Sequence, residues 1–338
     1  MKKLFLSLSL PVFILFFSVQ VSKAQNSTTD FLQFGTDNAG KLSSLYLGPL
    51  GQSLGNNMNN GWYNTAQAHR LGRFDFRIGF PVTLVSEPAR MFRFVESDFE
   101  GMSLVNPADD NAPSIFGNNE SGPLVSFAGE EFALPPGTGI NFFPVLPPSL
   151  QFNLGVSFDT ELMFRYLPDI NVSDFSTRMI GFGIKHGIKQ HIPGISLLPF
   201  DLSVILAYSR FHADYGLDYN PENNPQIDTD EQKMEINATA FNANLIISKK
   251  LSVITFFGGF RYMTSNTGIL MAGTYPVAAN GGSTGEILTN PVNINMNGGH
   301  VGLNGGFRLK LGLLSMFADA TLARYSSVNL GMSLGFHN

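Results

Sequence analysis

Residues 327–336 read SVNLGMSLGF, and this stretch decides the fold class of the chain. Its even-numbered positions are all large and apolar, whereas the odd-numbered positions are serine, asparagine or glycine. Successive side chains of a β-strand point to opposite faces, so the stretch predicts a strand with one wholly apolar face. Such a strand is typical of a wall between lipid and a wetter interior, as in a transmembrane β-barrel.

The same alternation recurs along the chain, most clearly in residues 74–84, 150–166 and 301–311. In each stretch the charged residues share the face opposite to the apolar one, where they would line a lumen. Weaker versions occur at residues 180–188, 200–208, 241–247, 254–262 and 314–322. The sequence therefore predicts an all-β fold, a transmembrane antiparallel β-barrel of about 10–14 strands with a short, partly helical N-terminal plug.

The composition agrees with a barrel. Charged residues make up 14% of the chain, which is low beside the roughly 25% of an average soluble domain. The net charge is −5, and it becomes more negative if the N-terminal lysines are removed, which argues against a nucleic-acid partner. After the first segment, no apolar run approaches the ~20 residues of a transmembrane helix. Strands are the remaining way to cross a bilayer, with outer-membrane lipid as the surrounding partner.

The first 24 residues have the pattern of a secretory signal peptide. Lys2 and Lys3 form the charged region, residues 4–21 the apolar region, and Ser22 to Ala24 a small-x-small cleavage site. We expect export, removal of residues 1–24, and localisation in the outer membrane of a Gram-negative cell.

Residues 25–66 differ from the strands that follow. From Asp37, a plausible N-cap, apolar residues recur at helical spacing, but Gly48, Pro49, Gly51 and Gly55 should limit the helix to short, broken turns. One interpretation is a plug inside the barrel formed by residues 67–338, with its leucines on apolar lumenal residues and its asparagines on polar ones. The other is a periplasmic tail around the barrel mouth. The candidate plug residues are Leu42, Leu45, Tyr46, Leu50, Leu54, Trp62 and Tyr63.

We expect the chain to end at the periplasm, where turns are short, so alternate connections counted back from the C-terminus should be short and periplasmic. Long connections then fall on the opposite side at residues 215–232 and 271–299, with short turns at Gly312, Lys249–Lys250 and 189–194. Residues 100–148 break this pattern as a long periplasmic segment. They either contain two more strands, near 124–132 and 140–145, or fold into the lumen. The chain has about ten strands without them and about twelve with them.

The lumen is the candidate functional site. Both signs of charge are predicted to point inward, from Arg73, Asp75, Arg77, Asp159, Glu161, Arg165, Lys185, Arg308 and Lys310. Opposite charges in a narrow lumen tend to pair, so one interpretation is a closed, salt-bridged interior. The other is a polar ring that sets selectivity beside a hydrophobic capture site. A barrel of about ten to twelve strands is too narrow for a general porin.

Motifs for chemistry are missing, so the sequence predicts no catalytic residue, no metal site and no cofactor. The Gly-x-Ser-x-Gly nucleophile motif does not occur. His186 and His191 lie across a predicted turn in an arrangement that suits a metal poorly. Asp214, Asp218 and the acidic residues 228–231 lack the spacing of a calcium loop and are typical of a solvated connection.

Three motifs carry a resemblance to a known group. Residues 61–66 (GWYNTA) with 69–75, residues 183–190 (GIKHGIKQ) with Pro193, and residues 198–203 (LPFDLS) resemble an uncharacterised family of outer-membrane proteins common in Bacteroidota. The resemblance implies a barrel fold and no established activity. More distantly, the N-terminal segment is similar to the hatch of long-chain fatty-acid and aromatic-hydrocarbon transporters, although residues 25–66 lack the Asn-Pro-Ala motif of that hatch.

Three functional hypotheses follow. The first is a plugged channel for passive uptake of small hydrophobic molecules, which would be its ligands. The second is a structural or accessory barrel with a periplasmic or secretion-machine partner. The third, an outer-membrane enzyme, is disfavoured because no catalytic motif is present.

Overall fold

The computed structural model describes residues 29–143, 148–219, 228–276 and 287–336. The expected signal peptide, residues 1–24, lies outside the described residues. None of the helices in these ranges is both long enough and apolar enough to cross a bilayer.

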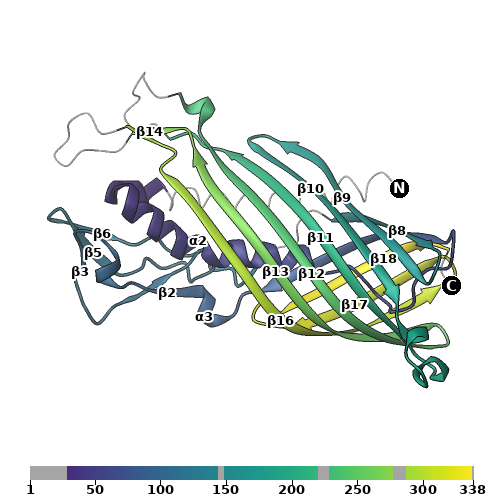
Figure 1. The fold of residues 1–338 in the computed structure, drawn as a ribbon. Coiled ribbons are helices and arrows are strands. Elements are labelled where there is room, and N and C mark those ends of the chain that lie inside the picture. The colour runs from purple at the N-terminus through teal and green to yellow at the C-terminus, as the bar shows by residue number, and fades with distance from the viewer. Residues whose placement is uncertain (1–28, 144–147, 220–227, 277–286, 337–338) are drawn as a thin grey trace.

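Ten antiparallel strands form a closed ring, which confirms the predicted barrel (Figure 1). The ring closes where β18 pairs with β1, from Asp75 opposite Gly335 to Thr83 opposite Ser327. In order around the ring, the strands are β1 (Phe74–Leu84), β8 (Ser149–Val156), β9 (Thr160–Val172), β10 (Phe175–Gly187), β11 (Asp201–Gly216), β12 (Lys233–Leu251), β13 (Ile254–Ala272), β16 (Val292–Leu311), β17 (Leu314–Leu322) and β18 (Ser327–Gly335).

The burial of side chains follows the predicted alternation. In β18, Leu330 and Leu334 are exposed on the outside of the ring, and Asn329 and Ser333 are buried on the inside. The other strands repeat this pattern on the outside, where large apolar side chains are exposed. The inside holds the buried charged and polar side chains together with buried apolar ones such as Phe211, Ile246 and Met263. A continuous apolar exterior with the buried charges inside is the arrangement of an outer-membrane β-barrel, because lipid contacts only the outer face.

Residues 150–166 form two strands, whereas the sequence predicts one. A tight turn at residues 157–159 joins β8 to β9, and Val156 lies opposite Thr160. The alternation runs through the turn unchanged because Leu154 pairs with Leu162, so even-numbered side chains stay outside in both strands. Phe158 and Asp159 adopt φ values of 62° and 49°, a conformation that is rare for residues other than glycine.

This turn moves the long segment to the other end of the barrel. We call the end that holds Phe74 and Gly335 the near end, and the opposite one the far end. Because β1 runs from near to far and β8 runs back, residues 85–143 lie at the far end. The expectation that residues 100–148 lie with the short turns is therefore wrong for the part that the structure describes. The long connections from β11 to β12 and from β13 to β16 also begin and end at the far end.

Residues 85–143 form a separate structure at the far end, which we call the lobe (Figure 1). Strands do form at both positions expected from the sequence, as the β5–β6 hairpin near residues 124–132 and as β7 (Phe142–Phe143) within 140–145. The hairpin belongs to a separate sheet, and β7 pairs only with the far end of β1, so neither adds a strand to the closed ring. The alternative that this segment fills the lumen is wrong. The lobe's own elements are α3 (Glu87–Arg90), β2 (Met91–Arg93), η2 (Glu96–Asp98), β3 (Met102–Leu104), β4 (Asn111–Pro113), β5 (Leu124–Phe127) and β6 (Glu130–Ala133). Short pieces β14 (Thr274–Pro276) and β15 (Ile287–Thr289) and the turns η3 (Lys189–His191), η4 (Ile195–Leu197) and η5 (Thr229–Glu231) lie in other connections.

A single helix precedes the barrel. After the turn η1 (Phe31–Phe34), α2 runs unbroken for 24 residues from Thr36 to Asn59, with Gly35 as its N-cap. The expected short, broken turns starting at Asp37 are wrong, because Pro49 and the glycines do not interrupt the helix. Propensity is a weak influence beside tertiary packing, and most of the second half of α2 is buried.

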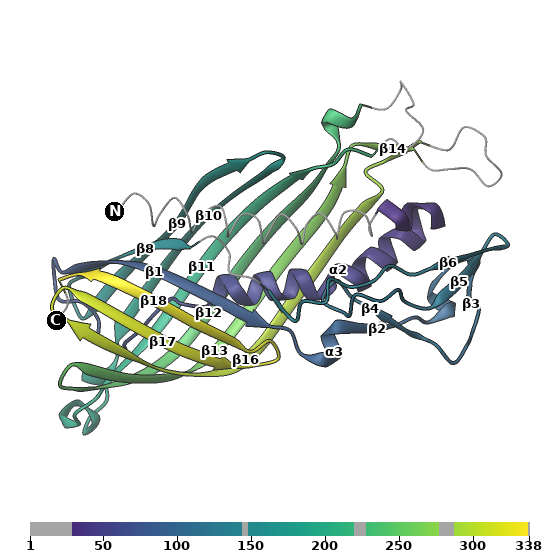
Figure 2. The same cartoon turned by 180° about the vertical axis from the view of Figure 1, so that it is seen from behind.

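The two halves of α2 have different surroundings (Figures 1 and 2). The first half belongs to the lobe, where the Tyr46 hydroxyl donates to the Pro136 carbonyl at 2.9 Å. Just before the helix, the ring of Phe34 in η1 contacts the rings of Phe127 and Phe132 at centroid distances of 5.6 and 5.4 Å. The second half enters the ring of strands and packs on β12, β13 and β16. One rigid element therefore joins the lobe to the lumen.

Candidate functional site

The chain threads the barrel from the far end to the near end. We call residues 51–72 the lumenal segment, because Gly51 is held by Thr267 of β13 and Gly72 by Gly155 of β8, at 3.1 and 3.0 Å. Between these points the Ala66 carbonyl accepts a hydrogen bond from the Ser203 hydroxyl of the wall, and the Ala66 amide donates one to the Ser248 hydroxyl. The wall begins only at Phe74, so this segment extends beyond the boundary expected at residue 66.

Two arginines hold the C-terminal end of α2. Arg165 of β9 donates to the carbonyls of Met58 and Asn60, at 3.1 and 3.0 Å. From the opposite side, Arg261 of β13 donates to the Asn59 carbonyl and, at 2.7 Å, to the Asn60 side chain. The last carbonyls of a helix have no partners within it and carry its negative dipole end. The wall thus supplies two positive charges where the helix needs donors.

Trp62 occupies a niche in the wall of the barrel. Its ring faces Gly181 and Gly183 of β10, where an added Cβ would lie 3.0 and 3.2 Å from ring carbons. The other side of the ring meets the Arg165 guanidinium, 4.0 Å from the ring centroid, a cation–π contact. Its carbonyl accepts from Arg77 at 3.0 Å. The two strand glycines let the indole approach the wall this closely, because even a Cβ at either position would press on the ring.

The asparagines that follow the apolar part of α2 bind to the wall. Asn56 donates to the Thr83 hydroxyl at 3.0 Å, and Asn57 to the Pro81 carbonyl at 2.8 Å, both in β1. On the other side, the Asn59 side chain accepts from Asn242 of β12 at 3.1 Å. Buried amides require such partners, so these bonds define one position of the segment along the lumen.

A buried charge cluster joins the last part of the lumenal segment to the wall. Glu161 accepts from Lys185 at 2.8 Å and contacts His69 Nδ1 at 2.6 Å, and all three side chains are at most 5% exposed. Asp75 lies 3.6 Å from Arg77 and accepts from Asn153 at 2.6 Å. Of the two interpretations of the lumen, these pairs favour the closed, salt-bridged interior.

The predicted lumenal residues divide into three groups. Six are buried inside the ring: Asp75, Arg77, Glu161, Arg165, Lys185 and Arg308. Arg73 and Lys310 are half-buried at the near end. Asp159 was expected on the lumenal wall and lies instead in the exposed turn between β8 and β9, because this stretch is two strands.

The predicted plug residues also differ in their burial. Leu42, Tyr46, Leu54, Trp62 and Tyr63 are buried, and Leu50 is half-buried against the same core. Leu45 is 37% exposed, which corrects its assignment to the packed face. At 3.6 residues per turn Leu45 lies on the side of the helix opposite to Leu54, whereas Leu47 lies on the same side as Leu54 and is buried.

Sequence reasoning missed three members of the site. Arg261 lies between the outward side chains Phe260 and Tyr262, so the alternation of that weaker strand could have identified it. Asp319 of β17, which accepts from Asn304 and Asn329 at 2.8 and 2.7 Å, could have been found in the same way. His69 has no such signal, because it lies in an irregular stretch before the first strand.

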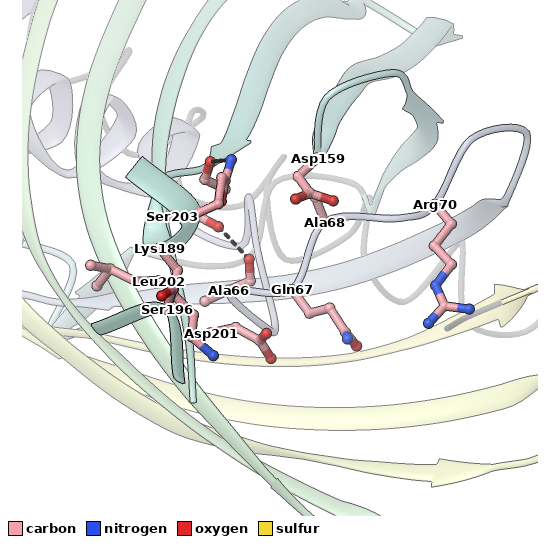
Figure 3. Close-up of a pocket in the computed structure, with 12 residues that line it drawn as sticks. Ala66, Gln67, Ala68, Arg70, Asp159, Lys189, Ser196, Asp201, Leu202 and Ser203 are labelled. Atoms are coloured by element: carbon pink, nitrogen blue, oxygen red, sulfur yellow. Dashed lines mark hydrogen bonds between the residues drawn. The ribbon is translucent and has the colours of Figure 1, made fainter. Parts of the chain in front are cut away.

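A polar pocket of about 290 Å³ opens at the near end (Figure 3). It lies between the end of the lumenal segment, at Gln67 and Arg70, and the connection from β10 to β11. Asp159, Lys189 and Asp201 give it charges of both signs. Beside it, the rings of His186 and His191 come together with their Nε2 atoms 3.3 Å apart. The described part of the chain brings no third His, Cys, Asp or Glu to them in a metal-binding group.

Comparison with known proteins gives a family and a fold. The model of a "Family of unknown function (DUF6588)" matches residues 1–336. No curated protein sequence matches the chain.

Among solved structures, three outer-membrane β-barrels are similar to the chain. The translocator domain of the autotransporter NalP from Neisseria meningitidis has a TM-score of 0.32 and 9% identity, over 89% of this chain and 98% of that one. Ail, the attachment invasion locus protein of Yersinia pestis, has a TM-score of 0.27 and 6% identity, over 79% and 99%. The outer membrane protease OmpT from Escherichia coli has a TM-score of 0.26 and 10% identity, over 82% and 99%.

Proposed function

Because the chain belongs to the DUF6588 family, whose function is unknown, we propose its function from the geometry: it is a closed outer-membrane barrel that anchors the lobe outside the bilayer. The observation that carries this proposal is that α2 serves both the lobe and the lumen. Its first half is part of the lobe's core, and its second half ends between Arg165 and Arg261. A lobe fixed in this way is a rigid docking platform for another component of the envelope, and no catalysis is involved.

The contacts of the lobe with α2 are specific as well as apolar. Asn38 exchanges two hydrogen bonds with the backbone of Glu100, at 2.9 and 3.0 Å. Tyr46 donates to the Pro136 carbonyl at 2.9 Å, and its own carbonyl accepts from the Ile115 amide at 3.1 Å. Withdrawing the helix from the lumen would therefore also disrupt the lobe.

The energetics of the lumen also favour a closed state. If α2 moved, Arg165 and Arg261 would lose their carbonyl partners while remaining inside the barrel. Leaving a buried donor or acceptor without its hydrogen bond costs about 1–3 kcal/mol, and more when the group is charged. Two such sites, together with the buried asparagines, oppose displacement of the segment by a weakly bound solute.

Passive uptake of small hydrophobic molecules is the second candidate, and one observation favours it. The far half of the lumen is lined by methionines around α2, at Met179, Met234, Met271 and Met296. Methionine is flexible and polarisable, and it adapts to apolar ligands of different shapes. Uptake would require the lumenal segment to shift. The resemblance of the N-terminal segment to the hatch of hydrocarbon transporters would then concern function as well as fold.

A reversible lock on α2 distinguishes the two functions. A Cβ built on Gly51 lies 3.3 Å from the Cβ of Thr267, close to the spacing of a disulfide, and the flexible end of Met296 is the group that must move. The double variant G51C/T267C can therefore tie the helix to β13. The natural chain has no cysteine, so no other disulfide can form.

Conductance in planar bilayers and uptake of a hydrophobic fluorescent probe into proteoliposomes should be measured before and after reduction. For an anchoring barrel both remain near the baseline in the oxidised and the reduced protein. If reduction opens a conductance or starts uptake, the anchoring proposal fails and uptake takes its place. The single variants G51C and T267C are the controls, since reduction should change neither.

A further inference from the structure

The outer wall of the barrel changes character near the far end, on strands β9 to β12. The strand register places four side chains in each row across these strands. One row is aromatic, with Phe164, Phe182, Tyr208 and Phe241. The next row is Tyr166, Ile180, Arg210 and Thr239, and the one after it contains Asp169, Arg178, His212 and Asn237. An aromatic row followed by charged rows is typical of the border between hydrocarbon and headgroups.

Two arginines project outward at this border. Arg178 and Arg210 lie on adjacent strands, where Ile180 pairs with Arg210 and Arg178 with His212. Both are exposed, and among the described residues Arg210 has no acidic partner. Arg178 has only a loose contact with Asp169, at 3.8 Å, in which both side chains are more than 60% exposed. A guanidinium on a lipid-facing wall needs a counter-charge, and the described residues of the wall do not provide one for Arg210.

A cavity between these arginines is formed by an irregularity in the sheet. The pairing of β9 with β10 shifts between Thr177 and Met179, so that Pro168 and Asp169 both stand opposite Arg178. This is a β-bulge, which bends the strand and opens the ladder locally. The resulting cavity has a volume of about 390 Å³, and its polar lining consists of Tyr166, Asp169, Arg178, Arg210, His212 and Asn237.

We infer that this cavity binds the phosphorylated headgroup of a glycolipid in the outer leaflet, with Arg178 and Arg210 on the phosphate. Guanidinium groups bind phosphate through paired N–H donors, and basic clusters at a membrane surface recognise anionic lipid headgroups. The aromatic row one step toward the bilayer centre provides a surface for the acyl chains. The far end carries the long connections, which in such barrels face the cell exterior.

The acidic groups nearby leave the two arginines available. Asp214 contacts His212 at 2.9 Å and accepts from Ser176, and Glu235 pairs with Lys233 at 2.7 Å. Asp169 is the only carboxylate in the arginine rows, and its contact with Arg178 is long and solvent-exposed. This site lies on the outside of the wall, so it is independent of the lumen and of the proposed anchoring function.

The test measures lipid binding to the purified full-length barrel. Purified lipopolysaccharide is titrated into the protein in a neutral detergent, and bound molecules are counted by native mass spectrometry. We expect the double variant R178Q/R210Q to bind at least tenfold more weakly than the natural protein. Lipopolysaccharide treated with phosphatase should bind the natural protein as weakly as the intact lipid binds the double variant.

The matched control is R324Q, which removes the same charge from an exposed position at the far end, between β17 and β18 on the other side of the ring. It should bind as the natural protein does, and heat-modifiable migration on gels should show that all variants are folded. The single variants R178Q and R210Q should each weaken binding. Equal binding by the double variant, or an equal loss in R324Q, would overturn the inference. If inorganic phosphate displaced the lipid at a concentration equal to that of the lipid, the acyl chains would add nothing and the assignment to a lipid headgroup would be overturned.

Discussion

The guanidinium of Arg165 lies 4.0 Å from the centre of the Trp62 ring while it donates hydrogen bonds to the carbonyls of Met58 and Asn60. One wall side chain thus holds the end of α2 and covers the aromatic ring that follows it. Trp62 is the only tryptophan in the chain. Its fluorescence is therefore a direct measure of whether the lumenal segment is seated in the barrel.

Replacing Arg165 should loosen this segment. In R165Q the carbonyls of Met58 and Asn60 lose their donor, at a cost of about 1–3 kcal/mol for each buried carbonyl. We expect a lower temperature of heat-modifiable unfolding and stronger quenching of Trp62 fluorescence by acrylamide. R324Q, which alters an exposed arginine, should change neither. Quenching equal to that of the natural protein would show that Arg165 does not hold Trp62.

Filling the glycine niche should expel the same ring. In G183V the new side chain would occupy space within 3.2 Å of the Trp62 ring and 2.8 Å of Met163. The indole must move toward water, so its emission should shift to longer wavelength. The matched control is G305V, also in a barrel strand, because an added Cβ at Gly305 meets no atom within 4 Å. An unchanged emission spectrum in G183V would contradict the described position of Trp62.

The Glu161–Lys185 pair should behave as a coupled unit. E161Q leaves the Lys185 ammonium buried without its counter-charge and should cost about 3–5 kcal/mol of stability. Adding K185M removes that isolated charge, so E161Q/K185M should be more stable than E161Q alone. The four proteins of this cycle can be compared by their temperatures of heat-modifiable unfolding. If the two substitutions simply add, the pair is not coupled and the contact of 2.8 Å carries no energetic weight.

The two ends of the barrel should be accessible from opposite sides of the membrane. Glu130 is exposed in the lobe at the far end, and Leu197 is 89% exposed in the β10–β11 connection at the near end. Because long connections face the exterior in such barrels, a membrane-impermeant maleimide should label E130C on intact cells. L197C should react only after the outer membrane is permeabilised. The reverse pattern would show that the lobe faces the periplasm.

Much of the barrel can be predicted from the sequence by itself, because the information is local. Outward leucines and inward polar residues alternate within each strand, as in residues 327–336, and the lipid that requires this pattern surrounds the whole ring. The buried charges Asp75, Arg77, Glu161 and Arg165 follow from the same alternation. Any sequence with this period places its charges on one face.

The tertiary structure decided what depends on contacts between distant residues. The turn at Phe158 and Asp159 contains no glycine or proline, so only the pairing of Val156 with Thr160 reveals it. Because this turn reverses the chain, it also decides at which end of the barrel the lobe lies. The continuity of α2 through Pro49 depends on burial by the lobe and the wall, which outweighs the low helix propensity of proline and glycine. The hydrogen bonds of Arg165 and Arg261 to the end of α2 join residues more than 100 positions apart in the chain. No local sequence pattern encodes such contacts.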